Sequence, residues 1–286
     1  EEFVFDGELY TIPEYDLKMV EEYLEQYIYS MELFVSGKDA VDWLQDSGEE
    51  QTLVIMPRLV KDMLKENLFS AKLPIIFSSA TLSLQKDFSY IAENLGVENH
   101  LAFSVASPFD YEEAMEITSE KVSNEDKDLA LFSLLQEEEQ TLVLFKSENE
   151  MLAFKEQFAA EFGNRIGFEG DRELSSIVRD FQNKELSILC SYNLWEGLDI
   201  PKDALTRVVI YDLPFPPVDP LFEAKRNYAK DAFKEVDLPF MLLRYRQGLG
   251  RLIRTSEDHG SIHLLLNEEE IQMLPELQKV SPVPMQ

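Results

Sequence analysis

Apolar residues in the first fifty positions recur at the spacing of one helix face, which predicts a helix over residues 16–34. The stripe consists of Tyr15, Val20, Tyr23, Leu24, Tyr27, Ile28, Met31 and Leu33. Its tyrosines are interpreted as packing residues, and stacking on nucleic-acid bases is the alternative. Residues 36–39 break the pattern, so the first part of the chain is predicted to be mostly helical.

From residue 51 onward, short apolar runs alternate with amphipathic segments. The apolar runs predict strands at residues 52–56, 73–77, 101–105, 114–118, 141–145, 165–168, 186–190, 207–211 and 261–266. The amphipathic segments predict helices at residues 58–68, 86–95, 125–137, 148–162 and 173–182. Ser147 and Glu150 have the spacing of a capping box at the start of one of them. This alternation is typical of an α/β fold with a parallel sheet covered by helices.

The charge of the chain is strongly negative but unevenly distributed. Its 286 residues, enough for about two domains, carry 55 acidic and 26 basic side chains, a formal charge of -29. This balance argues against a generally basic surface for nucleic acid. Residues 225–254, however, contain eight lysines and arginines against three acidic residues, a local excess of +5. A local basic surface is therefore compatible with the composition.

Cys190 is the only cysteine, which excludes an intrachain disulfide and a cysteine-ligated cluster within this chain. No apolar run approaches the roughly 20 residues of a membrane span, and no signal peptide is visible. These features predict a soluble protein of a reducing, cytoplasmic compartment. Because the chain begins at Glu1 without a methionine, we expect it to be part of a longer protein.

The first chemical motif is Q-x-x-G-R-x-x-R, formed by Gln247, Gly250, Arg251 and Arg254. If the segment is helical, the glutamine and both arginines share one face. Two guanidinium groups beside an amide suit a phosphate chain, and the glycine leaves room for a close approach. The alternative is an amphipathic helix whose arginines pair with carboxylates.

A second candidate follows the predicted strand at residues 73–77, where Ser79, Ala80 and Thr81 stand in a row. Small hydroxyl residues after such a strand lie at the carboxyl edge of a sheet, where α/β folds bind ligands. Alone, this signal is weak because similar turns are common.

A third candidate is the segment Trp-Glu-Gly-Leu-Asp-Ile-Pro at residues 195–201, after another predicted strand. Glu196 and Asp199 could orient a ribose hydroxyl or a guanidinium, and Gly197 could let the backbone approach a phosphate. The alternative is a surface loop with an apolar plug at Trp195.

Leu-Pro-Phe-Pro-Pro at residues 213–217 is predicted to be a rigid loop after a strand. It presents Phe215 either as part of a simple turn or as a stacking partner for a base. His259 and His263 are four residues apart, but the Gly-Ser turn between them argues against a metal site.

Taken together, these motifs resemble the C-terminal part of a superfamily 2 helicase of the DinG/XPD-like group, over residues 50–270. Ser79-Ala80-Thr81 resembles motif III, and residues 142–147 resemble motif IV. Residues 195–201, with the loop at 213–217, resemble motif V and its following loop. Gln247 to Arg254 resembles motif VI.

The resemblance implies a RecA-like second motor domain over residues 85–286, with helices on both faces of its sheet. Residues 51–84 would be the end of a first motor domain, and residues 1–50 the helical end of an arch-like insertion. ATP would lie between the two motor domains, with Mg²⁺ ligands from the first one. Single-stranded DNA and the first motor domain are the implied partners, with no membrane.

The resemblance also implies roles for single residues. Arg254 would be the arginine finger, Arg251 a second γ-phosphate contact, and Gln247 a member of the same catalytic cluster. The implied nucleotide-binding residues are Asp199, Glu196 and Gly250. Ser79, Ala80 and Thr81 would couple the two domains. The implied DNA-binding residues are Gly197, Trp195, Phe215 and Ser147.

One departure is decisive for activity: the 286 residues contain no G-x-x-x-x-G-K-[ST] motif and no DEAH-type motif. Half of the ATP site is absent, and there are no ligands for the family's iron–sulfur cluster. We therefore predict a helicase fragment that is inactive alone. The alternative is a nucleotide-sensing, DNA-binding module of a DinG-type exonuclease that does not unwind DNA. A small-molecule α/β enzyme is disfavoured, because no G-x-S-x-G elbow is present.

Overall fold

The computed structural model describes residues 2–5, 8–11, 13–37, 40–46, 51–57, 60–71, 73–79, 81–197 and 204–286. The chain divides into two compact units. Unit 1 comprises Glu1–Pro74, Asn94–Val97 and Pro217–Ala232. Unit 2 comprises Ile75–Glu93, Glu98–Pro216 and Phe233–Gln286.

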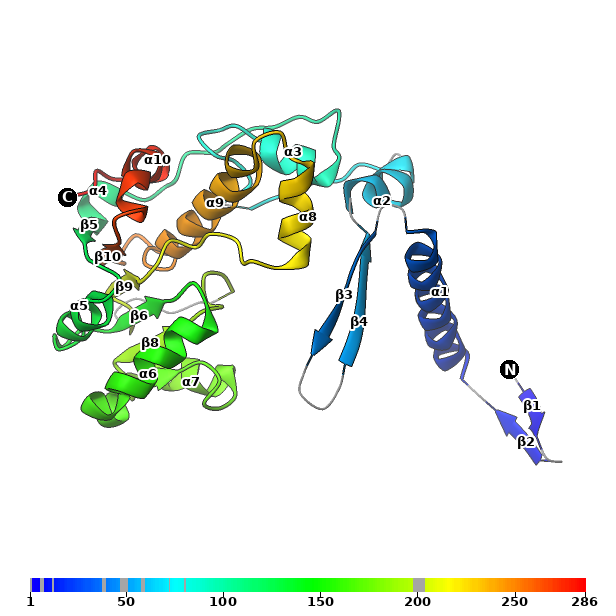
Figure 1. Cartoon of the computed structure of the whole chain (residues 1–286), viewed down its shortest axis with the longest axis horizontal. Helices are drawn as coiled ribbons and strands as arrows, with labels where there is room; N and C mark the ends of the chain where they lie inside the picture. The colour runs from blue at the N-terminus through cyan, green and yellow to red at the C-terminus, as the bar shows by residue number, and fades with distance from the viewer. Residues whose placement is uncertain are drawn as a thin grey trace. The chain divides into compact units, whose positions relative to one another are not determined.

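Unit 1 combines two antiparallel strand pairs with helices (Figure 1). Its elements are β1 (Glu2–Phe5), β2 (Glu8–Thr11), α1 (Glu14–Ser36), β3 (Ala40–Asp46), β4 (Gln51–Pro57), α2 (Val60–Asn67), η1 (Phe69–Ala71) and α8 (Pro220–Tyr228). The predicted helix is confirmed as α1, and it ends at Gly37, whose φ of 59° is left-handed. The strands β1, β2 and β3 were not predicted, so the first fifty residues are less helical than their pattern indicates.

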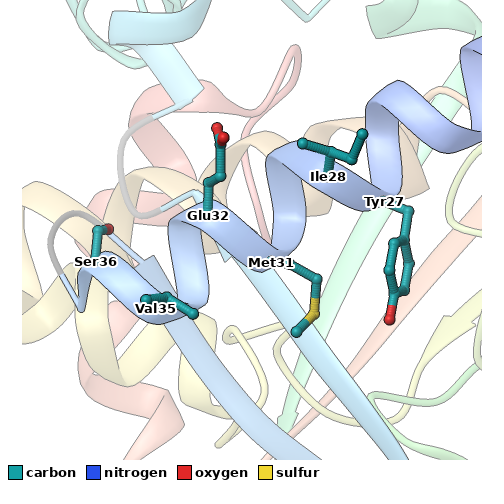
Figure 2. Close-up of a pocket in the computed structure, with 6 residues that line it drawn as sticks. All are labelled: Tyr27, Ile28, Met31, Glu32, Val35 and Ser36. Carbon is teal, nitrogen blue, oxygen red and sulfur yellow. The ribbon is translucent and has the colours of Figure 1, made fainter.

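Helix α1 has no buried residue among the side chains that the structure describes. Tyr15, Tyr23 and Tyr27 are 71%, 64% and 64% exposed, so their expected packing is not found among the residues that the structure describes. Tyr27, Ile28, Met31, Glu32, Val35 and Ser36 line a shallow, mostly apolar hollow on this helix (Figure 2). The apolar stripe is therefore largely exposed from Tyr15 to Ile28, whereas Met31 and Leu33 are half-buried.

Unit 2 contains a six-stranded parallel sheet in the order β5-β10-β9-β6-β8-β7. The strands are β5 (Met115–Lys121), β6 (Thr141–Leu144), β7 (Ile166–Phe168), β8 (Ile188–Ser191), β9 (Arg207–Ile210) and β10 (Gly260–Leu266). All six fall on predicted apolar runs. The α/β fold with a parallel sheet is thus confirmed.

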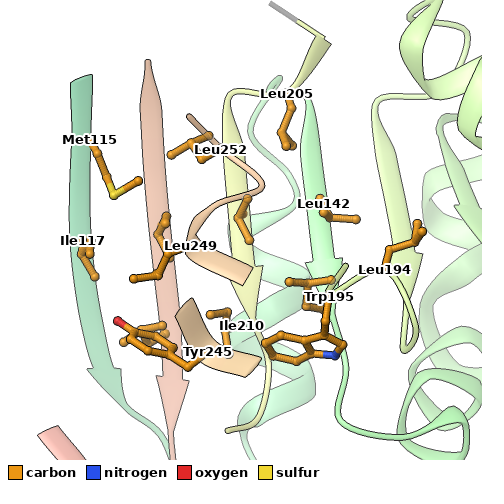
Figure 3. Close-up of a cluster of buried hydrophobic side chains, with 14 of the residues drawn as sticks. Met115, Ile117, Leu142, Leu194, Trp195, Leu205, Ile210, Tyr245, Leu249 and Leu252 are labelled. Carbon is orange, nitrogen blue, oxygen red and sulfur yellow. The ribbon is translucent and has the colours of Figure 1, made fainter. Parts of the chain in front are cut away.

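Helices cover both faces of this sheet because its strand residues alternate between two cores. Leu142 and Leu144 of β6 point into one core, which Figure 3 shows with Tyr245 and Leu249 of α9. Val143 of the same strand points into the other core. The helices of this unit are α4 (Tyr111–Ala114), α5 (Lys127–Leu134), α6 (Glu148–Phe162), α7 (Leu174–Gln182), α9 (Leu238–Leu249) and α10 (Leu274–Val280), with short turns η2 (Gly163–Arg165), η4 (Phe233–Asp237) and η5 (Glu270–Met273). Helix α3 (Ser89–Leu95) is divided between the two units.

Two strand predictions are wrong: residues 73–77 and 101–105 have no regular secondary structure. Ile76 and Leu101 are 91% and 96% exposed. An apolar run becomes a strand only where a neighbouring strand satisfies its backbone groups. Among the described residues, no strand pairs with either segment.

None of the described helices is both long and apolar enough to cross a membrane.

Candidate functional site

The loop after β8 and the end of α9 meet in unit 2 through a side-chain hydrogen bond. Gln247 Nε2 donates to Glu196 Oε2 over 3.1 Å, although the two residues are 51 positions apart. Both were predicted site residues, and the structure brings them together. The neighbouring Gly197 is exposed and has a φ of 77°, a conformation that favours glycine. Asp199, predicted for the same loop, lies outside the described residues.

A second link joins the same loop and helix through Arg244. Its Nη2 donates to the carbonyl oxygen of Tyr192 over 3.2 Å, and its guanidinium lies 5.6 Å from the Trp195 ring centroid. Burial lowers the pKa of Arg244, and the Glu196 carboxylate partly counteracts this effect. This arginine was not singled out from the sequence, because only the fold shows which loop it faces.

Trp195 is a core residue that joins three predicted motifs. Its indole is 1% exposed, and its Nε1 donates to the carbonyl of Phe145 at the end of β6 over 3.0 Å. The same ring packs on Gly248 of α9, as Figure 3 illustrates for the surrounding core. A ring buried this deeply has no surface for a DNA contact. The expected DNA-binding role of Trp195 is therefore corrected to the apolar plug, which the sequence left open as the alternative.

The packing of Trp195 makes Gly248 a sensitive position. A Cβ there would lie 3.1 Å from two ring atoms of Trp195 and 3.3 Å from Leu144. We expect Gly248→Val to lower the free energy of unfolding by about 1–3 kcal/mol, because the core would be overpacked. Chemical denaturation measures this change. Gly250→Ala, at an exposed turn without close contacts, is the matched control and should change it little.

Helix α9 ends at Leu249, so the condition under which Gln247, Arg251 and Arg254 would share one helix face is not met. Leu252 and Ile253 then turn into the core, with 3% and 5% exposure. This burial fixes the turn while Arg251 and Arg254 remain half-buried. Arg251 Nε donates to the backbone oxygen of Gln247 over 3.3 Å.

Asp258 holds the backbone of the turn that follows α9. Its Oδ2 accepts hydrogen bonds from the backbone N–H groups of Arg254 and Thr255 over 2.7 and 2.6 Å. The carboxylate is 5% exposed, so the two bonds form away from solvent. From the sequence, only an acidic residue four positions after the last arginine could have signalled this contact.

The segment that follows the predicted motif III is also tied to α9. Arg246 donates to the carbonyl of Ser83, and Leu84 packs against the core that α9 shares. The hydroxyls of Ser79 and Thr81 are 3.2 Å apart, and Ser79 Oγ accepts from the backbone N–H of Thr81. Ala80 lies outside the described residues.

Ser147 and Phe215 take local positions that their motifs predicted. Ser147 caps α6: its Oγ accepts from the Glu150 N–H over 3.4 Å and donates to the Glu150 carboxylate over 2.8 Å. The N-cap half of the predicted capping box is therefore confirmed, whereas the Glu150 carboxylate bonds the Ser147 hydroxyl instead of the Ser147 backbone N–H. Phe215 is half-buried, with its ring centroid 6.4 Å from that of Phe233.

A buried charge cluster at the carboxyl end of β9 was not found from the sequence. Lys127 is 2% exposed, and its Nζ contacts Asp212, Glu270 Oε2 at 2.8 Å and the Tyr211 carbonyl at 3.0 Å. Glu270 Oε1 accepts from the N–H of Leu213 over 2.8 Å and so holds the start of the proline loop. Burial raises the pKa of Asp212 to about 6, and Lys127 only partly opposes this shift.

This shift gives Asp212→Asn an expected pH signature. The folded pKa of about 6 exceeds the ordinary value of 3.8, so the folded protein binds the extra proton between these pH values. The contribution of Asp212 to stability therefore falls as pH rises from about 4 to about 6. We expect the unfolding free energy of Asp212→Asn, relative to the unsubstituted protein, to rise over this window by up to about 3 kcal/mol. Urea denaturation at a series of pH values measures it, and a constant difference would contradict the assignment.

Among the described residues, no group of three or more His, Cys, Asp or Glu side chains could hold a metal ion. His263 pairs with the hydroxyls of Thr118 and Ser261 on the sheet. Burial lowers its pKa. The residues that the structure describes therefore do not form a Mg²⁺ site.

Residues 131–268 match the family model described as Helicase C-terminal domain. The chain is 50% identical over 289 residues to the probable ATP-dependent helicase YpvA of Bacillus subtilis (strain 168), covering 99% of this chain and 45% of that protein. It is 31% identical to the 3'-5' exonuclease DinG of the same organism, over 85% of this chain and 29% of that protein. It is 29% identical to the ATP-dependent DNA helicase YoaA of Escherichia coli (strain K12), over 82% of this chain and 39% of that protein. The chain thus spans less than half the length of these relatives.

A solved XPD helicase structure superposes with a TM-score of 0.63 at 17% identity, over 98% of this chain and 56% of that one. A second structure, of apo XPD, superposes with a TM-score of 0.61 at 15% identity, over 96% of this chain and 63% of that one. At these identities the superpositions show the fold alone. They confirm the predicted RecA-like α/β fold. The chain belongs to the DinG/XPD-like superfamily 2 helicases and corresponds to their C-terminal part.

Proposed function

We propose that this chain is the second motor half of a DNA-dependent ATPase that couples ATP hydrolysis to movement on single-stranded DNA. The observation that carries the proposal is the hydrogen bond between Gln247 and Glu196. It joins the loop after β8 to the last turn of α9, which leads directly into the turn that carries Arg251 and Arg254, so that nucleotide and DNA contacts can influence each other. The relatives named as ATP-dependent helicases support the same function.

In the proposed chemistry, this chain supplies positive charge to the ATP phosphates. Arg254 acts as the finger and Arg251 as a second contact to the γ-phosphate, where negative charge must be stabilised in the transition state. Gln247 aligns with them, while Glu196 and Asp199 orient Arg251 or the ribose. Among the described residues, a Cβ at Gly250 would meet only the backbone oxygens of Gln247 and Arg246, at the ordinary contact distances of 3.4 and 3.5 Å. We infer that its missing side chain admits the nucleotide.

The remaining half of the ATP site has to come from the first motor domain of a longer protein. That domain would supply the phosphate loop and the Mg²⁺ ligands, since neither motif occurs in these 286 residues. We propose that residues 51–84 end this first domain, with Ser79, Ala80 and Thr81 as coupling residues. Residues 1–50 would end an arch-like insertion.

For DNA, we propose contacts from Gly197, Phe215 and Ser147, with Trp195 acting only behind them as a core residue. Phe215 is partly accessible and can stack on a base. The excess of basic residues between 225 and 254 adds attraction for the backbone. The overall charge of -29 predicts that this attraction is local and sensitive to salt.

A second candidate function rests on the 31% identity with a relative named as a 3'-5' exonuclease. In that case the chain would be a nucleotide-sensing, DNA-binding module attached to a nuclease, without unwinding activity. The two candidates differ in what ATP does to a DNA duplex.

The experiment that separates them uses the full-length protein and a labelled forked duplex. We expect strand separation that requires hydrolysable ATP and leaves both strands intact. Shortened strands without separation would support the exonuclease module and contradict the helicase proposal. Arg254→Ala in the same assay is the control that ties strand separation to this site.

A further inference from the structure

Glu169 is a buried carboxylate that the motifs do not include. It follows β7 directly and is 9% exposed. Its Oε2 accepts hydrogen bonds from the Ser191 hydroxyl at 2.5 Å and from the N–H groups of Tyr192 and Asn193, each at 3.2 Å. Its Oε1 accepts from Asn193 Nδ2 at 2.8 Å. One carboxylate thus receives four donors from the loop after β8.

Through these contacts, Glu169 at the end of β7 fixes the start of the loop that follows β8. Ser191 Oγ, held by Glu169, accepts in turn from the N–H groups of Asn193 and Leu194 over 3.1 and 2.9 Å. On the other side, the carbonyl of Tyr192 accepts from Arg244 of α9. The turn is therefore clamped between the end of β7 and helix α9. Trp195, Glu196 and Gly197 follow it immediately.

The chemistry of the clamp favours a charged acceptor. A buried carboxylate is costly unless its oxygens are hydrogen-bonded, and here both oxygens are. Among the described residues, no ion pair to Glu169 is found, so loop donors stabilise the charge. Hydrogen bonds to an ionised acceptor are about twice as strong as neutral ones, which gives a rigid turn.

We propose that Glu169 is a positioning residue that sets the place of Glu196 and Gly197 for the motor cycle. The proposal rests on the proposed function and deepens it. Glu169 touches neither ATP nor DNA; it acts through the turn at residues 191–194. Without the carboxylate, Glu196 no longer meets Gln247 in a defined geometry, and DNA binding no longer accelerates hydrolysis fully.

A double-mutant cycle in the full-length protein tests this role. Glu169→Ala should lower the kcat of ATP hydrolysis at saturating single-stranded DNA about tenfold. Combined with Gln247→Ala, it should add less than about threefold to the loss from Gln247→Ala alone, because both act through the same contact. The matched control is Glu173→Ala, an exposed carboxylate that accepts from the Ser175 hydroxyl at 2.6 Å. It should leave kcat within about twofold.

Hydrogen exchange of the amides at residues 192–197, measured without ATP or DNA, tests the clamp independently of activity. Glu169→Ala should speed exchange there by at least about tenfold, and Glu173→Ala should not. Unchanged exchange in Glu169→Ala overturns the proposal whatever the activity. The proposal is also overturned if the losses in kcat from Glu169→Ala and Gln247→Ala multiply fully in the double variant. If the unsubstituted protein shows no DNA-stimulated hydrolysis, the proposed function fails, and faster exchange would then support the clamp alone.

Discussion

Replacing Arg254 with alanine in the full-length protein is expected to lower kcat for ATP hydrolysis by about 10³-fold, with a much smaller change in nucleotide affinity. A finger stabilises the charge that develops on the γ-phosphate in the transition state more than the charge of bound ATP. Arg254 is suited to this role because Leu252 and Ile253 anchor the turn and Asp258 holds its backbone N–H. Its guanidinium is then presented from a fixed backbone.

Arg254→Lys should restore little of the lost activity, because a point charge does not reproduce the planar fork of a guanidinium. Arg172→Ala is the matched control: this arginine pairs with Asp180 on the surface of the same unit and should leave kcat unchanged. Thermal unfolding of each variant separates lost catalysis from lost folding. A folded Arg254→Ala protein with nearly normal kcat would show that Arg254 is not the finger.

Lys127→Met is expected to lower the free energy of unfolding by about 3–5 kcal/mol, because it leaves Asp212 and Glu270 buried without their cation. The three side chains are at most 9% exposed, so water cannot replace the lost contacts. The effect should spread to the loop at residues 213–217, since Glu270 also holds the N–H of Leu213. Chemical denaturation gives the magnitude.

The matched control for this change is Lys155→Met. Lys155 pairs with Asp171 at a site where both side chains are more than a third exposed, so the loss should stay below about 1 kcal/mol. Equal effects of the two substitutions would contradict a special role of the buried cluster.

The sequence predicted the sheet of unit 2 well, because each strand announces itself locally. Residues buried on both faces of a parallel sheet form continuous apolar runs, and five of the six strands contain one; β5 alternates apolar and polar residues instead. The same rule failed at residues 73–77 and 101–105, where the run exists but no partner strand is found among the described residues. An apolar run predicts that a segment is buried, but only the fold determines whether a neighbouring strand pairs with it.

The motif residues of the candidate site could be predicted from the sequence, but the residues that hold those motifs in place could not. Gln247 and Glu196 were expected in one cluster, and the structure joins them. Helical spacing does not place Arg254 on the same face as Gln247, because α9 ends at Leu249 and the following turn buries Leu252. Supports depend on partners distant in sequence, as with Lys127 and Glu270, which are 143 positions apart. No local pattern reveals such a pair.

The measurement that tests the central claim most directly is steady-state ATP hydrolysis, with and without single-stranded DNA, by this chain alone and by the full-length protein. If the chain is the second half of a two-domain ATP site, the full-length protein hydrolyses ATP and DNA stimulates it. The isolated chain, whose sequence contains neither a phosphate-loop motif nor a DEAH-type motif, stays at the background rate. Turnover by the isolated chain comparable to that of the full-length protein would contradict the account.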